Sequence, residues 1–84
     1  MSQKYFIYMV RCSDDSLYTG ITNNLENRLK VHNSGKASKY TRGRLPVKLV
    51  YQEDAIDKSS ALKREMVIKK LTKPEKEKLL KASG

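Results

Sequence analysis

The sequence contains one cysteine, no tryptophan, two prolines and one histidine in 84 residues. A lone Cys12 excludes an internal disulfide framework and is typical of a reducing compartment, so we expect a cytoplasmic protein. Cys12 and His32 are too few to build a Cys/His zinc site. No apolar run approaches the roughly 20 residues of a membrane span, and no signal-peptide cleavage region is present. We therefore expect no membrane partner.

Acidic residues are also scarce, because nine Asp and Glu stand against 18 Lys and Arg, a formal net charge of +9. The length excludes a two-domain enzyme, so we expect one domain over residues 1–84, with a core at about 4–71 and a C-terminal helix at about 73–82. An excess of positive charge attracts polyanions, which makes nucleic acid the first partner to consider. The alternative is that the lysines only keep the protein soluble.

The first part of the chain predicts a β-hairpin. Residues 4–12 (KYFIYMVRC) are apolar on both alternating faces, which predicts a central strand covered on both sides. Residues 13–16 supply turn chemistry, and residues 17–22 (LYTGIT) form the second strand. Gly20 lies inside that strand, where a missing side chain indicates a bulge or the close approach of another group.

The middle of the chain predicts one helix and a basic loop. Asn23 can cap a helix that runs from about residue 24 to 32 or 34, with Glu26 in capping-box register. Residues 35–44 (GKASKYTRGR) are rich in cations and carry no apolar stripe. They predict an exposed loop with one helical turn around residues 39–42.

The last part predicts a third strand and two helices. The strand covers residues 47–52, and alternation places three apolar side chains on one side of it: Val47, Leu49 and Tyr51. Capping residues then open helices at about 57–70 and 72–82. The order β-β-α-turn-β-α-α predicts an α+β fold with a three-stranded, mainly antiparallel sheet flanked by helices.

Two polar side chains share the apolar face of the first predicted helix. At 100° per residue, Leu25, Leu29 and His32 lie on one stripe, with Arg28 at its margin. Cations at i and i+4 repel weakly, so Arg28 and His32 are better explained with an anion between them. The alternative is a core histidine with satisfied hydrogen bonds and an arginine at the rim of the core.

Glu65 occupies an apolar position of the next long helix, between Ala61, Leu62 and Ile68. A carboxylate in such a position needs a cation. Lys69, at i+4, offers an ordinary surface ion pair. The functional alternative is a hard divalent metal, because Mg²⁺ takes a single carboxylate completed by waters and substrate phosphate. The pattern leaves both alternatives open.

Tyr8 and Tyr18 lie on the two strands of the predicted hairpin and are expected on one face. Two phenols so placed can meet a phosphate. They can equally be an aromatic pair that only packs across the hairpin.

Together these residues resemble the GIY-YIG nuclease superfamily, and in particular its small single-domain YhbQ-like branch. Phe6-Ile7-Tyr8 stands where the GIY triplet would be and Tyr18-Thr19-Gly20 where YIG would be. NLENRLKVH follows, with its arginine and histidine four apart, and then ALKRE with its glutamate. The resemblance covers nearly the whole chain.

The resemblance implies a divalent-metal-dependent endonuclease that hydrolyses phosphodiester bonds in DNA, with a structure-selective, repair-related role as the finer expectation. The implied cofactor is Mg²⁺ or Mn²⁺, held by Glu65. Tyr8 or Tyr18 would accept a proton from the attacking water, Arg28 would neutralise the scissile phosphate, and His32 would assist there or in proton transfer. The basic loop supplies the expected nucleic-acid contacts: Lys36, Lys39, Tyr40, Arg42 and Arg44.

The sequence also departs from the family pattern. Phe6 and Thr19 replace residues of the two triplets, Ile21 stands where many members carry a lysine, and no asparagine follows Asn33. These departures leave weak or substrate-restricted activity open, and with it a non-catalytic nucleic-acid-binding module on the same scaffold. A third alternative is a basic adaptor that docks an acidic protein through residues 69–81. RNA as substrate stays open, and no obligate protein partner is inferred.

Overall fold

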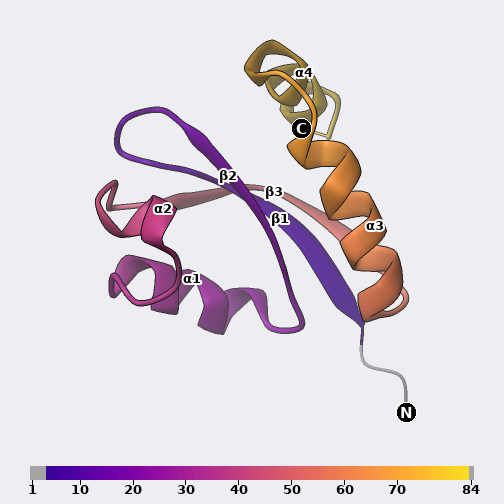
Figure 1. Cartoon of the computed structure of the whole chain (residues 1–84), viewed down its shortest axis with the longest axis horizontal. Coiled ribbons are helices and arrows are strands. Elements are labelled where there is room, and N and C mark those ends of the chain that lie inside the picture. The colour runs from indigo at the N-terminus through magenta and orange to yellow at the C-terminus, as the bar shows by residue number, and fades with distance from the viewer. Residues whose placement is uncertain (1–3, 84) are drawn as a thin grey trace.

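The computed structural model of the protein describes residues 4–83. Its sheet has three strands in the order β2-β1-β3, and both neighbouring pairs are antiparallel. The strands are β1 (Tyr5–Arg11), β2 (Leu17–Thr22) and β3 (Lys48–Ala55) (Figure 1). The predicted α+β fold with a central first strand is confirmed.

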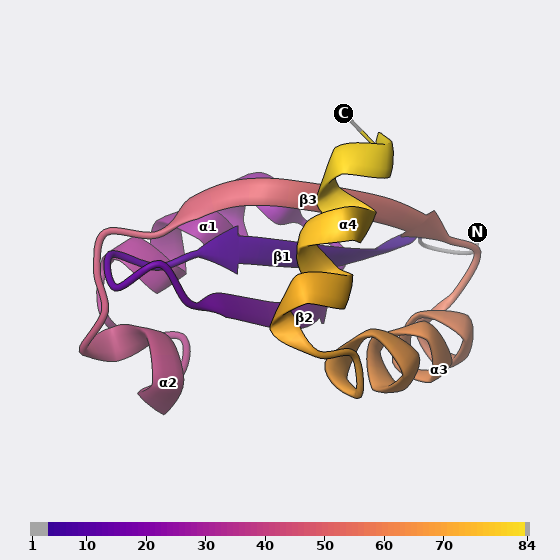
Figure 2. The same cartoon turned by 90° about the horizontal axis from the view of Figure 1, so that it is seen from above.

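Residues 4–83 form four helices beside the sheet: α1 (Leu25–Asn33), α2 (Lys39–Arg42), α3 (Lys58–Lys69) and α4 (Lys73–Ser83). Helices α1 and α2 lie on one side of the sheet, and α3 and α4 lie on the other (Figure 1, Figure 2). No helix within residues 4–83 has the length and apolarity to cross a bilayer.

Side-chain caps fix where the helices begin. The α1 cap is Asn24, whose Oδ1 accepts from the Asn27 amide at 3.0 Å, so the predicted Asn23 cap is wrong by one residue. Thr22 Oγ1 accepts from the Asn24 amide at 3.1 Å, so the last residue of β2 is hydrogen-bonded to the cap of α1. The predicted capping box of α4 is confirmed, since Thr72 and Glu75 exchange side-chain to amide bonds.

Alternation along β1 divides the core into two clusters. Ile7 and Met9 face α3 and pack with three further buried residues: Tyr51, Ala61 and Ile68. Tyr8 and Val10 face α1, where they pack with Cys12 and Val47. Both faces of the central strand are therefore covered, which is why its sequence is apolar at every position from Ile7 to Val10.

A β-bulge in β3 changes which residues share a face. Met9 pairs with Tyr51 and Val10 pairs with Leu49, so Val50 is the extra residue between them. The bulge shifts the alternation by one residue and places Val47 and Tyr51 in opposite clusters. The prediction that these two side chains lie on one side is therefore wrong, and β3 extends beyond residue 52 to Ala55.

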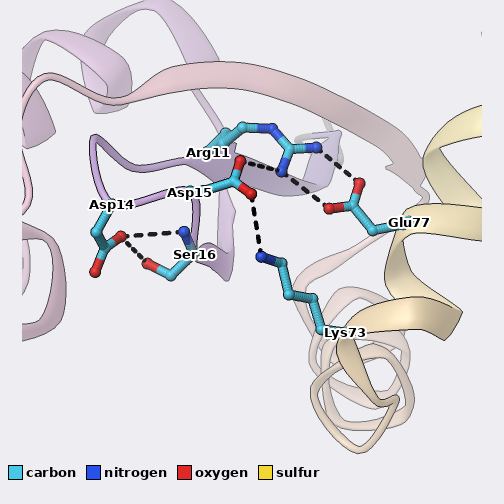
Figure 3. A network of polar contacts seen from close by, with 6 residues as sticks. All are labelled: Arg11, Asp14, Asp15, Ser16, Lys73 and Glu77. Carbon is cyan, nitrogen blue, oxygen red and sulfur yellow. Dashed lines mark hydrogen bonds and ion pairs between the residues drawn. The ribbon is translucent and has the colours of Figure 1, made fainter.

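Ion pairs attach α4 to the turn between β1 and β2 (Figure 3). Both terminal nitrogens of Arg11 donate to the Glu77 carboxylate, at 2.8 and 3.0 Å. Asp15 accepts from Arg11 at 3.0 Å and from Lys73 at 3.3 Å. Lys73, and after it Arg11, hold the pKa of Asp15 below its usual value. This network fixes the end of the hairpin that carries the YIG-like triplet.

Candidate active site

Tyr8 extends from β1 across the neighbouring strand β2 at Gly20. The two residues are paired in register, and a Cβ on Gly20 would lie 2.6 Å from the Tyr8 hydroxyl oxygen and 2.8 Å from its Cζ. Only glycine leaves the space that the phenol occupies. Of the two predicted explanations for this glycine, close approach is the one the structure shows.

The Tyr8 hydroxyl ends on His32, which reaches the sheet from α1. The hydroxyl lies 2.8 Å from Nε2 of His32, and Nδ1 lies 2.9 Å from Thr41 Oγ1 in α2. All three side chains are buried, with exposed fractions of 3%, 1% and 0% for Tyr8, His32 and Thr41. His32 is therefore a buried histidine with both ring nitrogens satisfied, as one alternative proposed, and it also contacts the candidate base.

Sequence reasoning did not single out Thr41. A turn of four residues such as α2 is too short to show periodicity, and two of the four are cations. No signal in the sequence distinguishes its hydroxyl from that of an exposed loop threonine.

The charges of Arg28 and Glu65 act on this buried pair. Burial, and after it the Arg28 guanidinium, lower the pKa of His32, so the imidazole is neutral at pH 7. Burial raises the pKa of Tyr8, Tyr18 and Glu65 raise it further, and Arg28 alone acts to lower it. The predicted site residues therefore share one electrostatic environment, although without bound ions the Tyr8 phenol is held in its neutral form.

Arg28 is a guanidinium without a carboxylate partner in the part of the chain that the structure describes. It is half-buried on α1 and makes no ion pair or side-chain hydrogen bond with residues 4–83. A half-buried guanidinium whose charge is not paired gains by binding an anion. This position suits a phosphate oxygen.

Glu65 lies on α3, which packs against both β2 and β1, and its charge acts on Tyr8. Its side chain is 15% exposed, and Lys69 Nζ lies 3.5 Å from Oε2. That distance exceeds a charge-assisted hydrogen bond, and a pair with a half-exposed lysine contributes roughly 0–1 kcal/mol, so Lys69 does not lock the carboxylate. The predicted flank is confirmed for the buried Ala61 and Ile68 but is wrong for Leu62, which is exposed.

The donor set at Glu65 fits a hard cation of the Mg²⁺ type. Within residues 4–83, no group of three His, Cys, Asp or Glu side chains could hold a metal by itself. A single carboxylate with open coordination positions suits Mg²⁺, which keeps several waters and takes substrate phosphate as ligand. The same set does not suit zinc, which prefers three or four protein ligands.

Aromatic rings connect the buried pair to the basic loop. Tyr18 packs edge-on against His32, with ring centroids 5.3 Å apart, and Tyr40 stacks on Tyr18 at 5.8 Å. Tyr8 and Tyr18 share the α1 face of the hairpin, as predicted. Arg44 covers the Tyr40 ring at 4.3 Å and is held by Asp14 through Nε at 2.9 Å.

The remaining cations of the basic loop are available to a ligand. Lys36, Lys39 and Arg42 line a small hollow of about 170 Å³ together with Gly35 and Ser38. None of the three forms an ion pair within residues 4–83. Arg44 differs from them, because its guanidinium is already engaged by Asp14.

Ile21 stands where the family pattern often has a lysine. It pairs with Ile7 and packs against the apolar cluster under α3. In this chain the Ile21 side chain therefore packs in the core, and it carries no charge that could act on Tyr8.

A family model described as the GIY-YIG catalytic domain matches residues 4–78. The chain belongs to the GIY-YIG family. This confirms the predicted resemblance, and because GIY-YIG is a nuclease family, membership implies a nucleic-acid substrate.

Close relatives of this GIY-YIG chain are found in several bacteria. UPF0213 protein CPE1444 of Clostridium perfringens is 54% identical over 79 residues, covering 94% of this chain and 85% of the relative. UPF0213 protein OB0043 of Oceanobacillus iheyensis is 50% identical over 80 residues, covering 95% and 93%. The solution structure of UPF0213 protein BH0048 of Bacillus halodurans matches with a TM-score of 0.63 at 40% identity, covering 96% of this chain and 86% of that chain.

Proposed function

We propose that the protein is a divalent-metal-dependent endonuclease that hydrolyses phosphodiester bonds in DNA. The observation that carries the proposal is the Tyr8 hydroxyl, buried over Gly20 on a neutral His32 and acted on by the charges of Arg28 and Glu65. This arrangement supports the proposal because a proton acceptor, an anion-binding cation and a metal-binding carboxylate are the groups that such a reaction needs.

The buried pair suggests how a proton leaves the attacking water. Tyr8 Oη lies 2.8 Å from His32 Nε2, and in the proposed arrangement the phenol donates this hydrogen bond. As the water attacks phosphorus, Tyr8 Oη would take the water proton while its own proton moves to Nε2, which gives an imidazolium and leaves the phenol neutral. Because burial raises the pKa of Tyr8, this relay is favoured over a stable tyrosinate.

The two charged side chains have separate roles in the proposal. Arg28 would hold a non-bridging oxygen of the scissile phosphate and neutralise the charge that grows there. Glu65 would hold Mg²⁺ or Mn²⁺, which when bound supplies positive charge at the phosphate and the leaving oxygen.

Contacts away from the scissile bond fall to the basic loop. The cations Lys36, Lys39 and Arg42 line one hollow and would hold a backbone phosphate next to the scissile one. Tyr40, which stacks on Tyr18, offers an aromatic ring between the candidate active site and the basic loop. Arg44 would contact the backbone only after giving up part of its pairing with Asp14. A structure-selective, repair-related role stays a prediction, as does the choice of DNA over RNA.

Cleavage of a DNA panel tests the proposal. Labelled duplex, nicked, flapped and single-stranded DNA are incubated with Mg²⁺ or Mn²⁺, and at least one is expected to be cut. Glu65→Gln and Arg28→Ala should each lower the single-turnover rate by roughly 10²–10³-fold.

Matched controls come from the exposed face of α1. Glu26→Gln and Lys30→Ala change the same charges at side chains that are 85% and 76% exposed, and should leave the rate unchanged. Cleavage that is equally fast in both site variants would remove the proposed site.

The second candidate is a nucleic-acid-binding module without turnover. The core position of Ile21 and the raised pKa of Tyr8 favour it. It predicts salt-sensitive binding that divalent ions do not change, with no strand scission on any substrate of the panel.

A further inference from the structure

We propose that Thr41 is a positioning residue, which fixes His32 in the tautomer that can accept the Tyr8 proton. The catalytic part of this inference rests on the proposed function. Its structural part, the tautomer of His32, is measurable in the protein alone.

The direction of the hydrogen bonds sets the tautomer. Thr41 Oγ1 donates to the Ser38 carbonyl oxygen at 3.4 Å, so its lone pairs face His32 Nδ1 at 2.9 Å. Nδ1 therefore carries the hydrogen and donates it to Thr41. Nε2 is left with a lone pair, to which the Tyr8 hydroxyl donates at 2.8 Å.

The opposite tautomer satisfies fewer groups. With the hydrogen on Nε2, His32 would donate to Tyr8, and the Tyr8 proton would have no acceptor among the contacts of residues 4–83. Thr41 would also have to turn its proton from Ser38 to Nδ1. An unpaired donor in such a buried site costs free energy, so these hydrogen bonds together favour the tautomer with its hydrogen on Nδ1.

The surrounding backbone holds Thr41 in place. It lies in the middle of α2, its carbonyl accepts from the Arg44 amide at 2.9 Å, and Ser38 caps the turn by accepting from the Tyr40 amide at 3.1 Å. Lys39 and Arg42 of the same turn line the basic hollow. One short turn thus presents cations outward to the hollow and a hydroxyl inward to His32, which contacts the candidate base Tyr8.

Nuclear magnetic resonance of the imidazole tests the tautomer directly. His32 is the only histidine in the chain, so long-range ¹H–¹⁵N correlations of its ring protons need no assignment. We expect a protonated Nδ1 and an unprotonated Nε2 in the wild type at pH 7.5. A protonated Nε2 in the wild type overturns the inference without any variant.

Substitution at Thr41 provides the second arm. Thr41→Val keeps the shape but removes the acceptor, so the ring should shift toward the Nε2-protonated form or a mixture. Thr41→Ser restores the hydroxyl and should return the wild-type spectrum. An unchanged ring spectrum in a folded Thr41→Val protein contradicts the proposed role, and Thr41→Ala replaces it if the valine variant does not fold.

Kinetics then tests the consequence for cleavage. Thr41→Val should lower kcat by roughly 10–100-fold with KM nearly unchanged, and Thr41→Ser should recover most of it. Lys39→Ala, in the same turn, should instead raise KM and leave the ring spectrum as in the wild type. A Thr41→Val variant with a shifted tautomer but wild-type kcat would overturn the catalytic part alone.

Failure of this inference and of the proposed function are distinguishable. If the wild type cuts no substrate, the nuclease proposal fails while the ring spectrum still decides the tautomer. If the wild type cuts and Glu65→Gln does not, but Thr41→Val behaves like the wild type in both assays, only the role of Thr41 is rejected.

Discussion

The two faces of β1 differ in what they bury. On the α3 face, Ile7 and Met9 pack against Ala61 and Ile68, and their stabilisation comes from apolar area removed from water. On the α1 face, Tyr8 is joined by the buried polar side chains of α1 and α2. One face of a single strand supports stability, and the other holds groups in a fixed arrangement.

The difference shows how a small domain accommodates a buried polar site. Burying hydroxyls and an imidazole costs free energy unless each finds a partner, and on the α1 face each does. The apolar face beneath, with the ion pairs of α4 at the hairpin turn, supplies the rigidity that this arrangement needs. Variants on the two faces should therefore affect different measurements.

Tyr8→Phe should give the largest separation of activity from stability. Loss of the hydroxyl removes the group that we propose takes the water proton, so cleavage should fall by roughly 10²–10⁴-fold. The unfolding free energy should fall by only about 1–3 kcal/mol, because a single acceptor on His32 is left unpaired. Single-turnover cleavage and urea denaturation measure the two effects, and wild-type cleavage would exclude Tyr8 as the acceptor.

Ile68→Ala should give the reverse result on the other face. Ile68 is fully buried, so its truncation should lower the unfolding free energy by about 2–5 kcal/mol. The cleavage rate per folded molecule should stay close to that of the wild type. Ile68→Val, with an expected loss of about 0.5–1.5 kcal/mol, serves if the alanine variant is unfolded. A cleavage rate that falls as far as in Tyr8→Phe would show that the faces are not separate.

Gly20→Ala should damage the α1 face by steric means. The added methyl group meets the Tyr8 hydroxyl and ring, which are held by His32, so stability should fall by about 1–3 kcal/mol and cleavage with it. Gly43→Ala is the matched control, because no described residue has an atom within 4 Å of its Cβ position. Equal Tm values for the two variants would mean that the phenol moves aside freely.

The pH dependence of stability should report the neutral His32. Its pKa is lowered by burial and Arg28, so the unfolded chain binds the proton more readily than the folded one. Stability should be full above pH 6.5, the ordinary histidine value, and should be lost as pH falls from there toward the lowered value. Denaturation between pH 7.5 and 5 should show this slope in the wild type, and a flat profile in His32→Gln. If the unfolding free energies of the wild type and His32→Gln change with pH in parallel, His32 is not the titrating group.

Thr19→Val should give the smallest effect, an increase in stability on the α3 face. Thr19 Oγ1 is buried without a hydrogen-bond partner among residues 4–83, so an isosteric methyl group should raise the unfolding free energy by about 1 kcal/mol. Cleavage should not change, since Thr19 faces away from Tyr8. A loss of stability in thermal denaturation would mean that the hydroxyl has a partner in solution.

The sequence predicted elements whose signals are local. The alternation of β1, the LYTGIT strand and the Thr72–Glu75 box depend on neighbouring residues, and the structure confirms them. The β3 bulge at Val50 was missed, because an extra residue is visible only when the partner strand is in place.

The candidate site was predictable in part for the same reason. Arg28 and His32 were found together because helical spacing places them on one face. Thr41 was missed, because only the tertiary fold brings the α2 turn to His32. The sequence also could not show that Arg44 is engaged by Asp14 at the hairpin turn.

Paramagnetic relaxation by Mn²⁺ tests the central claim most directly. Substoichiometric Mn²⁺ added to ¹⁵N-labelled protein with a short, uncleavable oligonucleotide should broaden the amide signals of Glu65, Gly20 and Tyr8 first. Glu65→Gln should abolish that selective broadening, while Glu75→Gln at the start of α4 should preserve it. Broadening that spares Gly20 and Tyr8, or that persists unchanged in Glu65→Gln, would contradict a metal-assisted site for phosphodiester hydrolysis formed by Tyr8 and Glu65.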